Sequence, residues 1–345
     1  YSGNPVLKNP GIKDFRDPKV MWYEAGHKWV MTLATHDRVS FYSSRDLKQW
    51  TKETEFGKNE GGHGGVWECP DLFPLALNGK TYWVLLVNIN PGGPNKGSVT
   101  QYFIGRFNGH RFMPVSTQEH WVDYGPDNYA GVTWSNTGNR RIFLGWMSNW
   151  LYAINSPTEK WRNAMTIPRE LGLKQEGDQI LLTSEPVKEL NVISNQIYAV
   201  DHLTVNKPIK ISDKSRSTAK QYLLKFSGRQ LTDFSLTLSD PAGQKLIIGY
   251  DSHADQYFID RSTSGNVNFN KEFASKHTAP RLTKDKAFDI TLIVDASSAE
   301  LFADGGLSNM TSIFFSSQPM NTLGVQSSKG IIVDKVRIST LKSIW

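Results

Sequence analysis

The stretch RDPKVMWYEAGHKWVMTL, which begins at Arg16, decides the fold because its pattern returns twice later in the chain. The second copy reads CPDLFPLALNGKTYWVLLV from Cys69, and the third reads GPDNYAGVTWSNTGNRRIFLGWM from Gly125. Every copy contains an Asp, a β-rich run, a Gly turn and a second run of aromatic and aliphatic residues. The almost equal spacing of these Asp residues indicates one structural unit per copy; they are Asp17, Asp71 and Asp127.

Further short β-rich runs follow the copies: RVSFYSS, TQYFIGRF and AMTIPREL. Val, Ile, Thr and aromatic residues dominate them and no helical period persists, so each repeat is typical of a four-stranded propeller blade. An open β-meander with chance similarity is the alternative. A closed propeller usually needs at least about four blades, and an open stack would expose its strand edges. The three repeats therefore predict further blades upstream of Tyr1.

The pattern changes after about residue 185, where short alternating strands such as QYLLKFSG, DFSLTLSD and FDITLIVD follow one another. Gly, Asp, Ser or Asn separates them, which is typical of a β-sandwich. We therefore expect an all-β chain with a partial propeller over residues 1–185, a linker over 186–198 and a C-terminal sandwich over 199–345. The linker region, which contains EPVKELNVISNQ, could include one short helical turn.

The composition is that of a globular protein with two domains, because 345 residues exceed one ordinary domain and 39% of them are hydrophobic. The net charge is +6, but the basic residues are scattered singly, which argues against a nucleic-acid partner. No apolar run is long enough to span a bilayer, so no membrane partner is expected. The single cysteine, Cys69, rules out an intrachain disulfide and leaves the compartment open.

Two acidic residues are candidates for glycosidic bond cleavage, which commonly uses a pair of carboxyl groups. Asp17 and Glu68 occupy corresponding places in consecutive repeats. Because the innermost strands of a propeller meet around one axis, we expect both carboxyl groups to reach one pocket. Arg16 would keep Asp17 ionised and could donate hydrogen bonds to sugar hydroxyls. The alternative is that Asp17, before a proline, forms a turn and that Glu68 is an ordinary half-exposed residue.

Other reactive residues fit a site less well. Cys69 could be a nucleophilic thiol, but no His–Asn partnership is evident. His36 and His63 lack the HxH or HExxH spacing of metal ligands, so neither a metal nor a cofactor is expected. Trp150 and Tyr152 could form an outer sugar subsite or could equally be packed in a core.

Two short motifs connect the chain to a known family. FRDPKV, over Phe15 to Val20, and WECPDLF, over Trp67 to Phe73, resemble two of the three signature motifs of glycoside hydrolase family 32, which contains invertases, levanases and inulinases. Further segments are similar to later parts of that family: YSSRDLKQW, DYGPDNYAG, GWMSNWLYA, PTEKWRNAMTIPREL, YFIDRSTSG and AELFADGG. The resemblance covers nearly the whole chain.

The resemblance implies a five-bladed β-propeller followed by a β-sandwich, and a retaining mechanism with a covalent fructosyl-enzyme intermediate. It implies that Glu68 is the general acid/base, that Asp17 stabilises the transition state and that Arg16 helps to bind the fructose. Three further positions are expected to act on the same fructose, by shaping its pocket or adding a hydrogen bond: Tyr129, Trp146 and Asp127. The expected substrate is a terminal β-D-fructofuranosyl linkage of levan, inulin or sucrose, and the expected location is outside the cell, at the cell surface or in the periplasm.

The chain departs from the family at one point. The family nucleophile is an Asp in an Asn-Asp-Pro-Asn-like motif, and no such motif occurs; besides Asp17-Pro18, the other Asp-Pro pair is Asp240-Pro241 in the sandwich. We therefore expect that the first two blades lie outside this chain, that they could be supplied as a separate chain, and that this polypeptide alone is inactive. An arabinanase-like inverting glycosidase and a non-catalytic fructan-binding protein are the alternatives.

Overall fold

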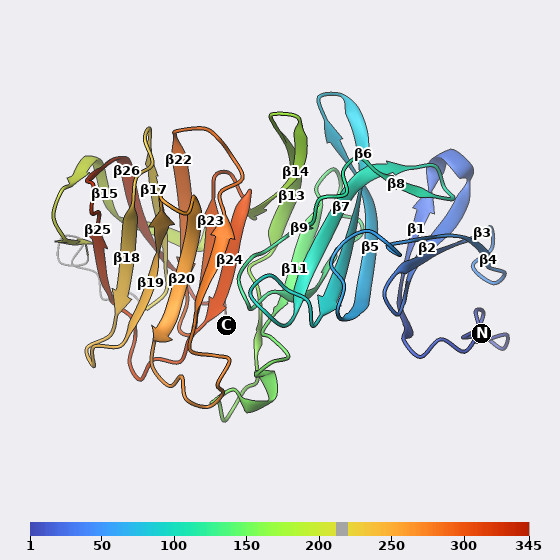
Figure 1. Cartoon of the computed structure of the whole chain (residues 1–345), viewed down its shortest axis with the longest axis horizontal. Coiled ribbons are helices and arrows are strands. Elements are labelled where there is room, and N and C mark those ends of the chain that lie inside the picture. Colours follow the sequence, from blue (N-terminus) through green and yellow to red (C-terminus); the bar gives the residue numbers. More distant parts are fainter. Residues whose placement is uncertain (212–219, 345) are drawn as a thin grey trace.

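A computed structural model describes residues 1–211 and 220–344, and in this part of the chain the strands form five antiparallel sheets. Figure 1 shows three sheets of the first half, coloured blue to green, beside two larger sheets of the second half, coloured yellow to red. The prediction of an all-β chain with propeller-type sheets followed by a sandwich is confirmed. The count of five blades stays a prediction.

Each sequence repeat forms one sheet whose first strand is the one that begins near the repeated motif. The first sheet has the order β1 (Phe15–Tyr23), β2 (Lys28–Thr35), β3 (Val39–Ser44) and β4 (Thr51–Phe56), with the 3-10 turn η1 (Glu24–Gly26) between its first two strands. The second has the order β5 (Val66–Leu77), β6 (Lys80–Asn90), β7 (Val99–Phe107) and β8 (Phe112–Pro114), and β9 (His120–Trp121) also pairs with β7.

The third sheet has the order β10 (Tyr129–Thr133), β11 (Ile142–Met147), β13 (Arg169–Glu176) and β14 (Gln179–Pro186). β12 (Ala164–Met165) pairs with the C-terminal end of β11, and the 3-10 turn η2 (Ala153–Asn155) lies in the loop between them. This loop is long and carries several exposed aromatic and aliphatic side chains. It is the green segment at the bottom of Figure 1.

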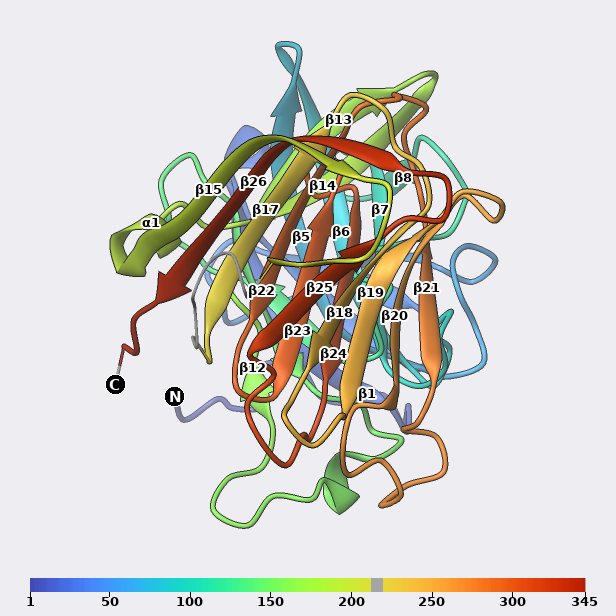
Figure 2. The same ribbon diagram turned by 90° about the vertical axis from the view of Figure 1, so that its left-hand side faces the viewer.

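The second half is a sandwich of two six-stranded sheets, seen from the side of the sandwich in Figure 2. One has the order β15 (Ser194–Val205), β26 (Ile331–Leu341), β17 (Tyr222–Gly228), β22 (Phe288–Val294), β23 (Ser298–Ala303) and β24 (Ser308–Ile313). The other has the order β16 (Ile209–Lys210), β25 (Thr322–Gln326), β18 (Phe234–Ser239), β19 (Lys245–Asp251), β20 (Gln256–Thr263) and β21 (Lys276–Pro280).

Alternation of buried and exposed residues builds the sandwich core. In β18, Phe234, Leu236 and Leu238 are buried and the residues between them are partly exposed, as the period of two of a half-buried strand requires. Across the core, the rings of Phe226 in β17 and Phe234 lie 5.3 Å apart between centroids. The two sheets therefore share one apolar layer.

The two halves meet where β24 lies against the third sheet. The segment from Asp123 to Asp127 runs beside β24, because the Tyr124 amide donates to Asn309 at 2.8 Å and the Asp127 amide donates to Thr311 at 3.3 Å. A Cβ at Gly125 would lie 2.2 Å from the Thr311 carbonyl oxygen, so only glycine permits this approach. The short helix α1 (Leu190–Ile193) lies in the expected linker, whose bounds stay a prediction.

Candidate active site

The innermost strands β1, β5 and β10 each contain a β-bulge at an equivalent place. In every case two residues lie opposite one residue of the partner strand, directly after Arg16, Glu68 and Tyr129. Bulges re-aim side chains and are frequent beside active sites. The first residue of each bulge has a left-handed backbone, with φ of 58° at Asp17, 45° at Cys69 and 52° at Ala130.

The bulges offset the expected correspondence of Asp17 with Glu68 by one residue. By its place in the bulge, Asp17 corresponds to Cys69, and Glu68 corresponds to Arg16. Asp71 lies beyond the bulge of its strand, and Asp127 lies before β10. The conspicuous repeated Asp is therefore not one structural position. Asp17 and Glu68 still come together, because each adjoins the same turn of its own innermost strand.

The Glu68 carboxylate lies between a phenol and a guanidinium. The Tyr129 hydroxyl donates a hydrogen bond to Oε2 of Glu68, and Nε of Arg16 lies 3.7 Å from Oε1. The Glu68 side chain remains 24% exposed, so part of the carboxylate faces solvent. An acid held on two sides and open on a third is suited to meet a substrate oxygen.

Asp17 is held beside Glu68 through Cys69. The Cys69 amide donates to Oδ2 of Asp17 at 3.0 Å, and the Cys69 sulfur lies 3.7 Å from the same oxygen. The left-handed backbone of Asp17 costs about 1 kcal/mol or more in a non-glycine residue. The hydrogen bond from the neighbouring sheet offsets part of that cost and directs the carboxylate towards β5.

Arg16 is oriented by a residue that the sequence reasoning missed. Its Nη2 donates to Oδ1 of the buried Asp14, while Nδ1 of His36 lies 3.0 Å from Oδ2 of the same carboxylate. The His36 hydrogen bond, followed by the charge of Arg16, lowers the pKa of Asp14 and keeps it ionised. The sequence offered one signal for this contact, which is that Asp14 lies two positions before Arg16.

Cys69 is not a nucleophile in this setting. Burial, and then the negative charges of Asp17 and Glu68, raise the pKa of its thiol to about 12. A nucleophilic cysteine needs the opposite, a pKa lowered towards neutrality. The thiol therefore stays protonated and acts as a small residue between two acids.

An aromatic wall borders the two acids. Tyr129 in β10 pairs with Trp146 in β11, and their rings meet edge to face with centroids 6.4 Å apart. Trp150 extends this wall: its ring centroid lies 5.0 Å from that of Trp146, and the residue is half exposed. Burial, and then the Glu68 carboxylate, raise the pKa of Tyr129 above its ordinary value, so its phenol remains a hydrogen-bond donor.

Asn88 braces two of the bulges and was also missed from the sequence. It is fully buried in β6, and its Nδ2 donates to the carbonyl oxygens of Cys69 and Gly131, each at 3.3 Å. Its Oδ1 accepts from the Gly131 amide at 3.2 Å. Because both bulges depend on one side chain, Asn88 couples the acid-bearing strand to the tyrosine-bearing strand. The sequence signal for this role was the polar amide side chain of Asn88 within the apolar run WVLLVNIN.

Asp71 joins the three sheets and takes no part in the cluster around Glu68. Its buried Oδ2 accepts from the Thr133 amide at 2.6 Å and the Thr133 hydroxyl at 2.8 Å. The Lys19 ammonium of the first sheet lies 3.4 Å from the same oxygen. The Asp71 carboxylate thus links neighbouring sheets that share no paired strands.

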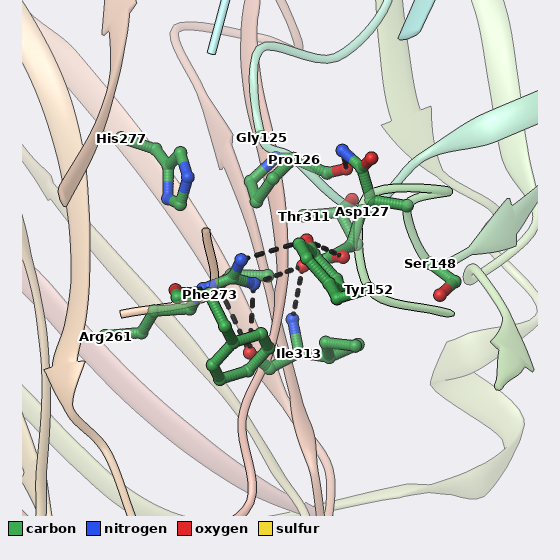
Figure 3. A network of polar contacts seen from close by, with 12 residues as sticks. Gly125, Pro126, Asp127, Ser148, Tyr152, Arg261, Phe273, His277, Thr311 and Ile313 are labelled. Carbon is green, nitrogen blue, oxygen red and sulfur yellow. Dashed lines mark hydrogen bonds and ion pairs between the residues drawn. The ribbon is translucent and has the colours of Figure 1, made fainter. Parts of the chain in front are cut away.

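Asp127 faces the sandwich (Figure 3). Its fully buried carboxylate accepts from the Tyr152 hydroxyl at 2.6 Å, the Arg261 guanidinium at 2.6 Å and the Ile313 amide at 2.9 Å. The hydrogen bond to fructose expected of Asp127 finds no support in these contacts. Tyr152 is fully buried as well, which favours core packing over an outer subsite for this residue.

The two remaining histidine candidates lie apart from any metal-type cluster. His36 is bonded to Asp14, and His63 is exposed and stacks on Trp67 with ring centroids 5.6 Å apart. Within residues 1–211 and 220–344, no group of three or more His, Cys, Asp or Glu side chains could hold a metal ion.

Comparison with known families accounts for almost the whole chain. The model for the glycosyl hydrolases family 32 N-terminal domain matches residues 1–185, and the model for the family 32 C-terminal domain matches residues 189–343. The chain belongs to glycosyl hydrolase family 32. The resemblance carried by FRDPKV and WECPDLF is thereby confirmed.

The relatives with similar sequences include a levanase and an exo-inulinase. The chain is 40% identical over 359 residues to a levanase of Bacillus subtilis, covering 100% of this chain and 53% of the levanase. It is 34% identical over 371 residues to an extracellular exo-inulinase of Aspergillus awamori, covering 100% of this chain and 69% of that protein. The chain thus spans about half of the levanase.

Solved family 32 structures share the fold. A crystal structure of the Aspergillus awamori exo-inulinase superimposes with a TM-score of 0.89 at 32% identity, covering 99% of this chain and 71% of that one. A β-fructofuranosidase of Schwanniomyces occidentalis in complex with fructosyl-erythritol gives 0.86 at 27% identity, covering 99% and 73%. In the described residues of this family 32 chain, no helix has the length and apolar character needed to cross a membrane.

Proposed function

We propose that this protein is an exo-acting β-fructosidase that cleaves terminal β-D-fructofuranosyl linkages of levan, inulin or sucrose. The observation that carries the proposal is the Glu68 carboxylate, held between the Tyr129 hydroxyl and Arg16 and joined through Cys69 to Asp17. Family membership and the names of the levanase and exo-inulinase relatives support the substrate class.

Each residue has a role in the proposed retaining reaction. Glu68 donates a proton to the leaving oxygen as the glycosidic C–O bond breaks, and then accepts a proton from the water that releases fructose. Asp17 accepts hydrogen bonds from fructose hydroxyls and stabilises the positive charge that develops at the anomeric carbon. Arg16 binds the same sugar, and Tyr129 and Trp146 form the side of its pocket.

Two further points belong to the proposal. The motif that carries the nucleophilic Asp in the family has no match in residues 1–345, so we assign the nucleophile to none of these residues. The expected inactivity of residues 1–345 alone and the separately supplied N-terminal blades stay predictions. Secretion is proposed because the exo-inulinase relatives are named extracellular.

The test uses the full-length product of the gene with levan, inulin and sucrose. Release of free fructose, first seen as the β-anomer by NMR, is the expected result, because a retaining enzyme keeps the anomeric configuration. Glu68→Gln should lower the release of fructose by roughly 10²- to 10⁴-fold, the contribution of a general acid, whereas Glu119→Gln at an exposed position should not.

Three outcomes would refute the proposal. Initial release of the inverted anomer would favour an arabinanase-like course. Cleavage of arabinan in preference to fructans would point to a different substrate. Fructan binding without fructose release by the full-length protein would make it a binding protein.

A further inference from the structure

The sandwich reaches the proposed active site through one fully buried side chain, Arg261 of β20. Nη1 donates to Oδ2 of Asp127 at 2.6 Å, Nη2 donates to the Tyr152 hydroxyl at 2.9 Å and Nε donates to the Phe273 carbonyl oxygen at 2.7 Å (Figure 3). The Phe273 ring lies beneath the guanidinium, 3.9 Å from its carbon to the ring centroid. Both acceptors on the first half are themselves fully buried.

The two segments held by Arg261 carry the two sides of the proposed pocket. Asp127 lies two residues before Tyr129, whose hydroxyl donates to Glu68. Tyr152 lies two residues after Trp150, which packs on Trp146. The Tyr152 hydroxyl also donates to Asp127 at 2.6 Å, so the two segments are joined to each other as well as to the sandwich.

We propose that Arg261 is a positioning residue for the reaction, through which the sandwich sets the place of Tyr129 against Glu68 and of Trp150 against Trp146. The inference rests on the proposed fructosidase function and adds to it a role for the second domain. Arg261 is bonded to neither Asp17 nor Glu68, so it acts only through the segments that carry Asp127 and Tyr152.

The physical reason is that the contact is rigid and has no substitute nearby. A planar guanidinium fixes its partners in direction as well as distance, and buried charge pairs tolerate little displacement. No water can replace Arg261 without leaving the Asp127 carboxylate uncompensated in a fully buried place. A shift of the bonded segments by about 1 Å can lower a rate about 100-fold, because catalytic groups must meet the substrate in one geometry.

The chain contains a matched control for this arrangement. Within the sandwich, the Tyr257 hydroxyl donates to Oδ2 of Asp304 at 2.8 Å, and Nε of Arg281 donates to the same oxygen at 3.0 Å. This second Tyr–Asp–Arg group has the same chemistry and is largely buried, but its side-chain hydrogen bonds stay within the sandwich. Tyr257→Phe removes the hydrogen bond that the hydroxyl donates to Asp304, and Tyr152→Phe removes the equivalent bond to Asp127 together with the bond accepted from Arg261.

The experiment compares Tyr152→Phe, Arg261→Lys and Arg261→Met with Tyr257→Phe in the full-length protein. Each variant is assayed on sucrose, whose leaving oxygen requires a proton from the general acid, and on an aryl β-fructofuranoside, whose 4-nitrophenolate leaves without one. Initial rates over a range of concentrations separate kcat from KM. Thermal unfolding of each variant measures the structural effect independently.

We expect Tyr152→Phe to lower kcat/KM on sucrose by roughly 10- to 100-fold and to lower kcat/KM on the aryl substrate much less, because kcat/KM reports the step in which the leaving group departs and only sucrose needs a proton there. Arg261→Lys should do the same more strongly, and Arg261→Met more strongly still, because lysine keeps the charge that methionine loses. Tyr257→Phe should lower the unfolding temperature without changing the ratio of the two activities.

Equal losses of kcat/KM on both substrates in Tyr152→Phe, or the same ratio of the two kcat/KM values as in Tyr257→Phe, would show that the contact is only structural and would overturn the inference. If an Arg261 variant fails to fold, Tyr152→Phe, which keeps the ion pair, still decides the question. A wild-type protein that hydrolyses neither substrate would instead overturn the proposed function, so the two failures are distinguishable.

Discussion

Replacing Arg169 with methionine tests how strongly the two halves are joined. Arg169 in β13 is fully buried, and its guanidinium donates to Asp123 of the first half and to Glu300 of the sandwich, each at 2.8 Å. It also donates to the Thr311 hydroxyl at 2.7 Å. Methionine fills a similar volume but leaves two buried carboxylates without their cation.

The magnitude follows from that imbalance. Removing one partner of a buried ion pair destabilises a protein by about 3–5 kcal/mol, because the remaining charge is neither solvated nor paired. Two carboxylates share Arg169, so we expect a loss at the upper end of that range. Equilibrium urea unfolding, followed by tryptophan fluorescence, measures the free energy of unfolding of Arg169→Met and the wild type.

The matched control is Arg229→Met, the same chemical change at an arginine whose side chain is 85% exposed and lies 3.2 Å from Asp334. Exposed ion pairs contribute only about 0–1 kcal/mol. If Arg169→Met lowers the free energy of unfolding by no more than Arg229→Met, the buried network does not join the halves and the reasoning fails. Replacing Arg169, Asp123 and Glu300 together by apolar residues should restore part of the loss.

Three further predictions follow from single contacts. Iodoacetamide at pH 8 should leave Cys69 of the folded protein unmodified, because its thiol has a pKa of about 12, and rapid labelling seen by mass spectrometry would contradict this. Burial, and then the Arg261 charge, lower the pKa of His277 from 6.5 to about 3, so the unfolded state takes up a proton below pH 6.5 that the folded state refuses. Stability should therefore decrease as pH falls from about 6.5 towards 3, by about 1.4 kcal/mol per pH unit, and His277→Gln should flatten that slope in urea titrations. A Cβ at Gly131 would lie 2.1 Å from the Phe143 ring, so Gly131→Ala should lower stability by about 1–3 kcal/mol, and an unchanged melting temperature would show that the bulge adapts.

The sequence by itself determined the strands, the repeats and the residues of the acid cluster. Period-two alternation and turn glycines are local features, so they can be read without the fold. FRDPKV and WECPDLF indicated Arg16, Asp17 and Glu68, and these three residues lie together in the structure. How they act on fructose stays a proposal.

The tertiary structure alone decided that Asp17 corresponds to Cys69 and not to Glu68 or Asp71, and that the three repeated Asp residues lie in separate places. A bulge is a property of strand pairing, so the correspondence of Asp17 with Cys69 cannot be read from one strand. Asp71 bonds across the sheets, and Asp127 bonds to Arg261, which is distant in sequence. Buried charge follows its partner in space, and neither composition nor spacing shows where that partner lies.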